Sequence, residues 1–75
     1  MNNDPVPELK KQLAIIIGKW IYDEKLNQDE AAEILGIHRP EVSNIQRGKL
    51  EKFSLDSLLQ YAWRAGRLVS IKVID

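Results

Sequence analysis

The strongest constraint on the fold of this chain is Gly36, which separates two short segments of helical character. Asn27 is a good N-cap and Glu30 follows it at the spacing of a capping box, so we expect a helix over residues 28–35. Glycine suits the position that ends this helix, because it adopts a positive φ without the steric penalty of a Cβ. Gly36 therefore permits a sharp turn into the next helix.

A second short helix is expected over residues 39–47. Pro40 suits its first turn, because the missing N–H would have no partner inside the helix, and Gly48 stops it. The small residues Ala31 and Ala32 allow the two helices to cross closely. The apolar residues that fill the wedge between them are Ile37, Val42 and Ile45. Two helices joined in this way form a helix-turn-helix, whose second helix enters the major groove of DNA.

Further helical segments flank this motif. Apolar residues three and four apart predict a long helix over residues 7–25, and Ser54 caps another helix that Gly66 ends. Beyond it the pattern changes to alternation of β-branched residues, which is typical of a strand. We therefore expect a mainly α fold of four to five helices with a C-terminal β-strand. We expect a flexible arm over residues 1–6, a helix-turn-helix domain over residues 7–66 and a dimerisation strand over residues 67–75.

The terminal strand implies a partner chain. A single strand cannot satisfy its own backbone hydrogen bonds, and no other segment of this sequence has strand character. The simplest solution is a twofold homodimer in which two copies of the strand pair antiparallel across the axis. The residues expected to cover the last helix from that strand are Val69, Ile71 and Val73. The alternative for the terminal segment is a tail without structure. Trp63, on the preceding helix, fits either the core or an interface.

Composition excludes most kinds of chemical site. The 75 residues suffice for one domain, and they contain no cysteine and only one histidine, His38. We therefore expect no disulfide, metal site or cofactor, and the absence of a carboxylate pair on an apolar face argues against an enzyme. No apolar run approaches the ~18 residues of a membrane span, so we expect a cytoplasmic protein.

The neutral total charge conceals an uneven distribution. Lysine and arginine together number 11, as do aspartate and glutamate. Residues 28–35 carry a net charge of −3, whereas residues 36–53 carry +2. The basic residues expected on the side that meets DNA are Arg39, Arg47, Lys49 and Lys52. The sequence therefore predicts a modest basic face, with which a monomer would bind DNA weakly.

The segment from Leu26 to Lys49 resembles the helix-turn-helix of the XRE superfamily, the phage repressor and Cro type. The continuation from Phe53 to Leu59, with the glycine and β-segment that follow, is closer to the HigA-like antitoxin branch. The resemblance covers roughly residues 9–75. It implies a dimeric repressor that binds a palindromic operator in double-stranded DNA. It further implies the antitoxin of a type II toxin–antitoxin module that regulates its own operon, with a RelE-like toxin as partner.

The same resemblance assigns roles to individual residues. Those expected to face base edges are Arg39, Glu41 and Asn44, and those expected to contact the DNA backbone are Gln28, Ser43, Arg47 and Lys49. Arg39 is suited to guanine and Asn44 to adenine, each through two hydrogen bonds. Glu41 has a second interpretation, because it stands three residues after His38 and is able to cap that backbone N–H.

Two departures from the family pattern affect this assignment. His38 stands where relatives often have a serine or threonine cap. Gln46 and Ile21 stand where many have a glutamate–arginine pair that joins the recognition helix to the first helix. A different function also fits the motif: a protein-binding inhibitor that uses the helix-turn-helix only as a scaffold.

Overall fold

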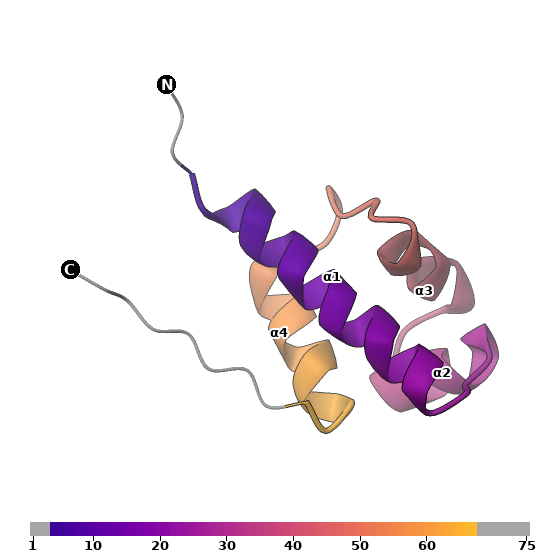
Figure 1. Ribbon diagram of the computed structural model, residues 1–75. Coiled ribbons are helices and arrows are strands. Elements are labelled where there is room, and N and C mark those ends of the chain that lie inside the picture. Colours follow the sequence, from indigo (N-terminus) through magenta and orange to yellow (C-terminus); the bar gives the residue numbers. More distant parts are fainter. Residues whose placement is uncertain (1–3, 68–75) are drawn as a thin grey trace.

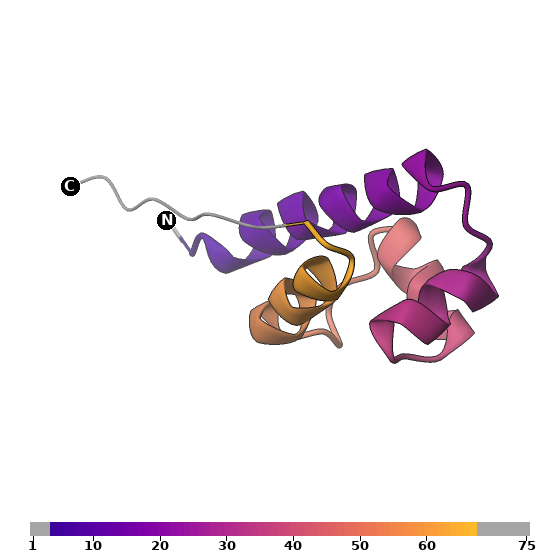
Figure 2. The same ribbon diagram turned by 90° about the horizontal axis from the view of Figure 1, so that it is seen from below.

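The computed structural model describes residues 4–67, and these residues form four helices. In chain order the helices are α1 (Val6–Asp23), α2 (Gln28–Leu35), α3 (Arg39–Gln46) and α4 (Leu55–Arg64). Helix α1 lies across the others, with α4 on one side of the molecule and the α2–α3 pair on the other (Figure 1, Figure 2). The predicted mainly α fold with a helix-turn-helix is confirmed.

One apolar core lies where α1 crosses the other helices. Its largest fully buried side chains are Ile17, Leu35, Val42, Ile45 and Leu58. No polar or charged side chain of residues 4–67 is buried. Trp20 belongs to the core, whereas 70% of the surface of Trp63 is exposed, so this second tryptophan is not a core residue. The helix-turn-helix is therefore held against α1 by apolar packing.

The four described helices end in the same way. Each is followed by a residue with positive φ, and these residues are Lys25, Gly36, Gly48 and Gly66. The N–H of the next residue then donates to the carbonyl five positions earlier in the chain, as Ile37 does to Ala32 at 3.0 Å. This arrangement satisfies carbonyls that the end of a helix leaves without an N–H partner. The three glycines are the ones that the sequence analysis identified as stops.

Several helix boundaries differ from the predicted ones. The first helix spans Val6–Asp23 rather than residues 7–25. It begins one residue early because Pro5 occupies the N-cap position and the Asp4 carboxylate accepts a hydrogen bond from the Val6 N–H at 3.0 Å. It ends two residues early because Lys25 adopts a φ of 55°. Val6, which was expected in the arm over residues 1–6, therefore belongs to α1. Helix α3 ends at Gln46, one residue before the predicted end at Arg47.

The predicted C-terminal strand falls outside the described residues. Arg67 belongs to no helix or strand, and Val69, Ile71 and Val73 lie in the part of the chain that the structure does not describe. Strand pairing and dimerisation through these residues therefore stay predictions. Across residues 4–67, no helix combines the length and the apolar character that crossing a membrane requires.

Candidate nucleic-acid interface

The turn between α2 and α3 is fixed by an arginine from α4. Gly36 has a φ of 72°, and Nη1 of Arg64 donates a hydrogen bond to the Leu35 carbonyl oxygen at 2.6 Å. A Cβ built on Gly36 would lie 2.6 Å from the same Nη1 atom. Glycine is therefore favoured here by its positive φ, and a Cβ would in addition require the Arg64 side chain to shift. The sequence analysis missed Arg64, because nothing in its spacing links it to a turn 29 residues away.

Both short helices begin at well-formed caps. In α2 the Glu30 N–H donates to Asn27 Oδ1, and the Asn27 N–H donates to Glu30 Oε1, each at 2.8 Å. The predicted capping box is confirmed. At the start of α3 the His38 N–H donates to Glu41 Oε1 at 2.9 Å. The capping interpretation of Glu41 is thus the one that the structure shows, and it holds the Glu41 carboxylate at the N-terminus of its own helix.

The residues predicted to contact DNA lie at the start of α2, along α3 and just after α3. Val42 and Ile45 turn into the core, so α3 presents its other face to solvent. The exposed members of the set are Arg39, Arg47 and Lys49, and the half-buried members are Gln28, Glu41, Ser43 and Asn44. The structure therefore leaves all seven accessible to solvent on the helix-turn-helix.

The loop that carries Lys49 is anchored to the core. Leu50 and Phe53 are both buried, and Phe53 packs edge-on against Tyr61 of α4 with ring centroids 6.3 Å apart. These contacts hold the loop after α3 against α4, beside the recognition helix (Figure 1). The position of Lys49 is therefore restricted by the apolar anchors that follow it in the sequence.

Gln28 lies at the centre of a row of polar contacts between α2 and α3. Its Oε1 accepts a hydrogen bond from Arg39 Nε at 3.2 Å, and its Nε2 donates to Gln46 Oε1 at 2.9 Å. The Arg39 guanidinium also lies near the Asp29 carboxylate, with 3.8 Å between Nη1 and Oδ2. The sequence analysis placed Gln28 and Arg39 on DNA separately, and it gave Gln46 no part in the interface. Their mutual contact depends on the crossing of α2 and α3.

Asn44 and Arg47 also contact each other. Nη2 of Arg47 donates to Oδ1 of Asn44 at 3.1 Å. An asparagine that reads adenine accepts from N6 through Oδ1 and donates to N7 through its amide nitrogen. Arg47 therefore occupies the Asn44 oxygen that adenine recognition requires, and a phosphate that attracts Arg47 would release it.

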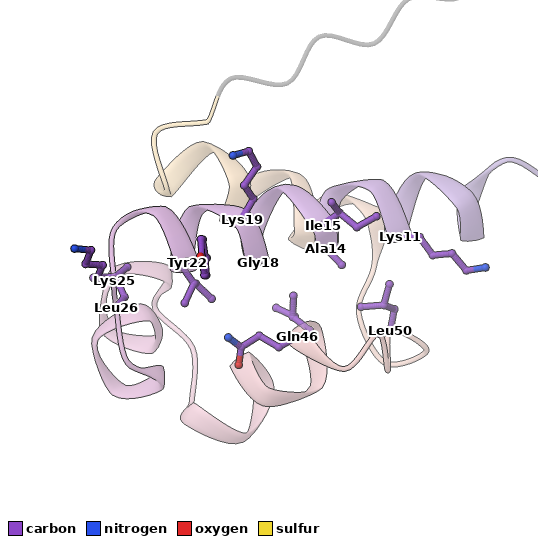
Figure 3. Close-up of a pocket in the computed structure, with 13 residues that line it drawn as sticks. Lys11, Ala14, Ile15, Gly18, Lys19, Tyr22, Lys25, Leu26, Gln46 and Leu50 are labelled. Atoms are coloured by element: carbon purple, nitrogen blue, oxygen red, sulfur yellow. The ribbon is translucent and has the colours of Figure 1, made fainter.

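An open groove of about 950 Å³ lies between α1 and the end of α3 (Figure 3). Ile15 and Tyr22 of α1 contribute exposed apolar surface, and Gln46 of α3 forms part of the opposite wall. The charged residues of its lining are Lys11, Lys19 and Lys25. This lining holds no histidine or carboxylate, and residues 4–67 contain no cluster of side chains able to hold a metal ion.

The charge distribution follows the predicted division. Asp29, Glu30 and Glu33 of α2 are exposed to solvent. The exposed basic residues of α3 and the loop after it are Arg39, Arg47, Lys49 and Lys52. The outer face of α3 and the loop after it therefore carry four of the chain's eleven lysines and arginines. These cations attract anionic phosphates, whereas the first turn of α2 carries the exposed carboxylates of Asp29 and Glu30.

Comparison with known proteins agrees with this geometry. A family model described as a helix-turn-helix domain matches residues 3–74. The chain belongs to the XRE helix-turn-helix superfamily. A solved structure named as an XRE-family transcriptional regulator is 32% identical, with a TM-score of 0.85 over 92% of this chain and 78% of that one. A search of curated proteins found no match. These findings do not distinguish the HigA-like branch from other XRE proteins.

Substitution of two glycines tests the turn at Gly36. Gly36→Ala should lower the free energy of unfolding by about 1–2 kcal/mol, because alanine is disfavoured at positive φ and its Cβ meets Arg64. Gly18→Ala is the matched control. A Cβ at Gly18 meets no atom within 4 Å, and alanine favours the helix interior by roughly 0.5–1 kcal/mol. Urea denaturation of both variants measures the difference. An equal effect of the two substitutions would contradict the need for a positive φ at Gly36.

Proposed function

We propose that this chain is a sequence-specific DNA-binding transcriptional regulator, a repressor that uses α3 as its recognition helix. The observation that carries the proposal is the solvent-accessible outer face of α3, with Arg39 at its start and Asn44 five residues later. Membership of the XRE superfamily and a structural relative named as a transcriptional regulator support the same function.

The proposed contacts are divided between bases and backbone. Arg39 reads a guanine, and Asn44 reads an adenine once Arg47 has turned to a phosphate. The proposed backbone contacts are Gln28, Ser43, Arg47 and Lys49. Glu41 mainly caps α3, since its carboxylate is already bonded to the His38 N–H and would repel phosphates. Specificity then depends chiefly on Arg39 and Asn44, and affinity on the basic residues.

Two substitutions test this division. Arg39→Ala should relax the preference for one base pair, with a loss of about 1–3 kcal/mol on the preferred sequence. Lys49→Ala should weaken binding to all sequences alike and lower the slope of log K against log salt by about 1. Lys19→Ala is the control, because Lys19 pairs with Asp23 on the exposed side of α1. Gel-shift titrations on a selected duplex supply the measurements. Unchanged affinity in both test variants would reject this recognition surface.

We propose further that the regulator acts as a homodimer on a palindromic operator. Two observations support this proposal: residues 67–75 alternate β-branched and other residues, and the exposed Trp63 lies on the helix that leads into them. An amphipathic ring such as Trp63 is typical of interfaces. Pairing of two copies across a twofold axis would place the recognition helices about 34 Å apart, one turn of DNA.

Deletion of the residues after Gly66 tests the dimer. The core lies within residues 13–65, so the truncated chain should keep its helical circular dichroism. It should sediment as a monomer at a concentration at which the full chain is dimeric, and it should lose affinity for a palindromic duplex while it still binds a half-site weakly. A truncated chain that sediments as a dimer would contradict pairing through Val69, Ile71 and Val73.

An antitoxin role is supported by the resemblance of Phe53–Leu59 and the following segment to the HigA-like branch. An antitoxin binds its toxin as well as its operator, so this role and the regulator role are compatible, and a protein-binding module without DNA affinity is the alternative. Co-expression with the product of the adjacent gene distinguishes them. We expect copurification of a small RelE-like toxin, and failure of the two proteins to copurify would argue against the antitoxin role but not against DNA binding.

A further inference from the structure

Arg39 is the first residue of α3 and Gln46 is the last, and both lie on one face of the helix. They are seven residues apart, which is close to two helical turns, so their side chains leave the helix in nearly the same direction. Both side chains bond to Gln28 at the start of α2. One amide from α2 is therefore held between the first and the last residue of the recognition helix.

The chemistry of these groups allows only one direction for the row of bonds. A guanidinium donates and never accepts, so Arg39 requires the oxygen of the Gln28 amide. The nitrogen of that amide is then left as a donor, and it needs an acceptor on its other side. Gln46 Oε1 supplies that acceptor at 2.9 Å. The donor-only Arg39 thus sets the orientation of the Gln28 amide, and Gln46 stabilises that orientation by accepting from its nitrogen.

The surroundings of Gln46 explain why it turns toward α2. Ile21 of α1 is apolar and buried, so it offers no hydrogen-bond partner to the end of α3. Gln46 itself is exposed, and Gln28 is the partner that its side-chain oxygen contacts. Where many relatives are expected to join α3 to α1 by an ion pair, this chain joins α3 to the start of α2. The replacement therefore couples a residue outside the base-reading set to Arg39.

We propose that Gln46 is a positioning residue for DNA recognition. By accepting from Gln28 Nε2, it holds Gln28 Oε1 toward Arg39 Nε, and this fixes the direction in which the guanidinium projects from α3. Gln46 thereby controls the base preference of Arg39 without contacting a base itself. The inference rests on the proposed DNA-binding function, and it adds a residue that the sequence and the family pattern assign to no DNA contact.

Two substitutions separate the hydrogen bond from other properties of Gln46. Gln46→Leu has a similar size but no acceptor, whereas Gln46→Glu keeps an acceptor in the same place. Gln12→Leu is the control, since Gln12 is an exposed glutamine on α1. Because Gln46 and Gln12 are exposed, we expect all three variants to keep the thermal unfolding midpoint of the wild type, as measured by circular dichroism.

The main measurement is base preference. The first duplex is the one that the wild type selects from a random library. The second differs from it at one base pair, the one for which Arg39→Ala loses its preference. The affinity of each variant for the two duplexes is compared. Gln46→Leu should lower the ratio of the two affinities about three- to tenfold, as expected for loss of one net hydrogen bond. Gln46→Glu should keep the ratio within about twofold while the added charge weakens both affinities. Gln12→Leu should change neither the ratio nor the two affinities. In the Arg39→Ala background, Gln46→Leu should cause no further loss of base preference.

A second measurement needs no DNA. The Arg39 Nε–H proton should exchange with solvent more slowly in the wild type and in Gln46→Glu than in Gln46→Leu, as followed by NMR.

Each contrary outcome has a distinct meaning. If the wild type selects a duplex but Gln46→Leu keeps its preference, or weakens all sequences alike, the inference fails and the regulator function stands. Loss of preference in Gln46→Glu as large as in Gln46→Leu would also overturn it, because the acceptor would not be the cause. Equal Arg39 Nε–H exchange in the three proteins overturns it without DNA. Absence of salt-dependent DNA binding by the wild type would instead overturn the proposed function and the inference together.

Discussion

The hydrogen bond from Arg64 to the Leu35 carbonyl is the interaction on which the recognition surface depends. It joins the end of α4 to the end of α2 at the turn where the chain reverses into α3. Gly36 supplies the positive φ of the turn, and the guanidinium lies beside it. The bond thus supports, from outside the motif, a turn whose two helices are packed by the apolar core. A helix of eight residues is only marginally stable alone, so such support is needed.

Hydrogen bonds between surface side chains restrict the outer face of α3, which the apolar core leaves free. The core fixes α3 through Val42 and Ile45 but leaves the side chains of its outer face free to rotate. Bonds from Gln28 to both ends of α3, and from Arg47 to Asn44, restrict that freedom before any ligand arrives. Preorganisation of this kind lowers the conformational entropy lost on binding.

Local rules predicted most of the fold because the signals act over three or four residues. The capping box at Asn27 and the positive φ at Gly36 were both predictable in this way. The predicted end of α1 was wrong. Lys25 adopts the left-handed conformation that glycine usually supplies, so α1 ends two residues early. The sequence left Glu41 with two interpretations, a base contact or a cap. The observed bond to the His38 N–H is a cap, and it forms between residues only three positions apart.

The helices, the turn between α2 and α3, and the set of residues on the outer face of α3 were predictable from the sequence. These follow from periodicity and capping, which depend on neighbours along the chain. The contacts among those residues were not predictable and depend on the tertiary structure. Arg64 and Leu35 are separated by 29 residues, and Gln28 and Gln46 by 18, so no local pattern could predict either bond. Both pairs meet because the aliphatic core fixes the crossing of the helices, and that crossing brings the polar side chains within hydrogen-bond distance.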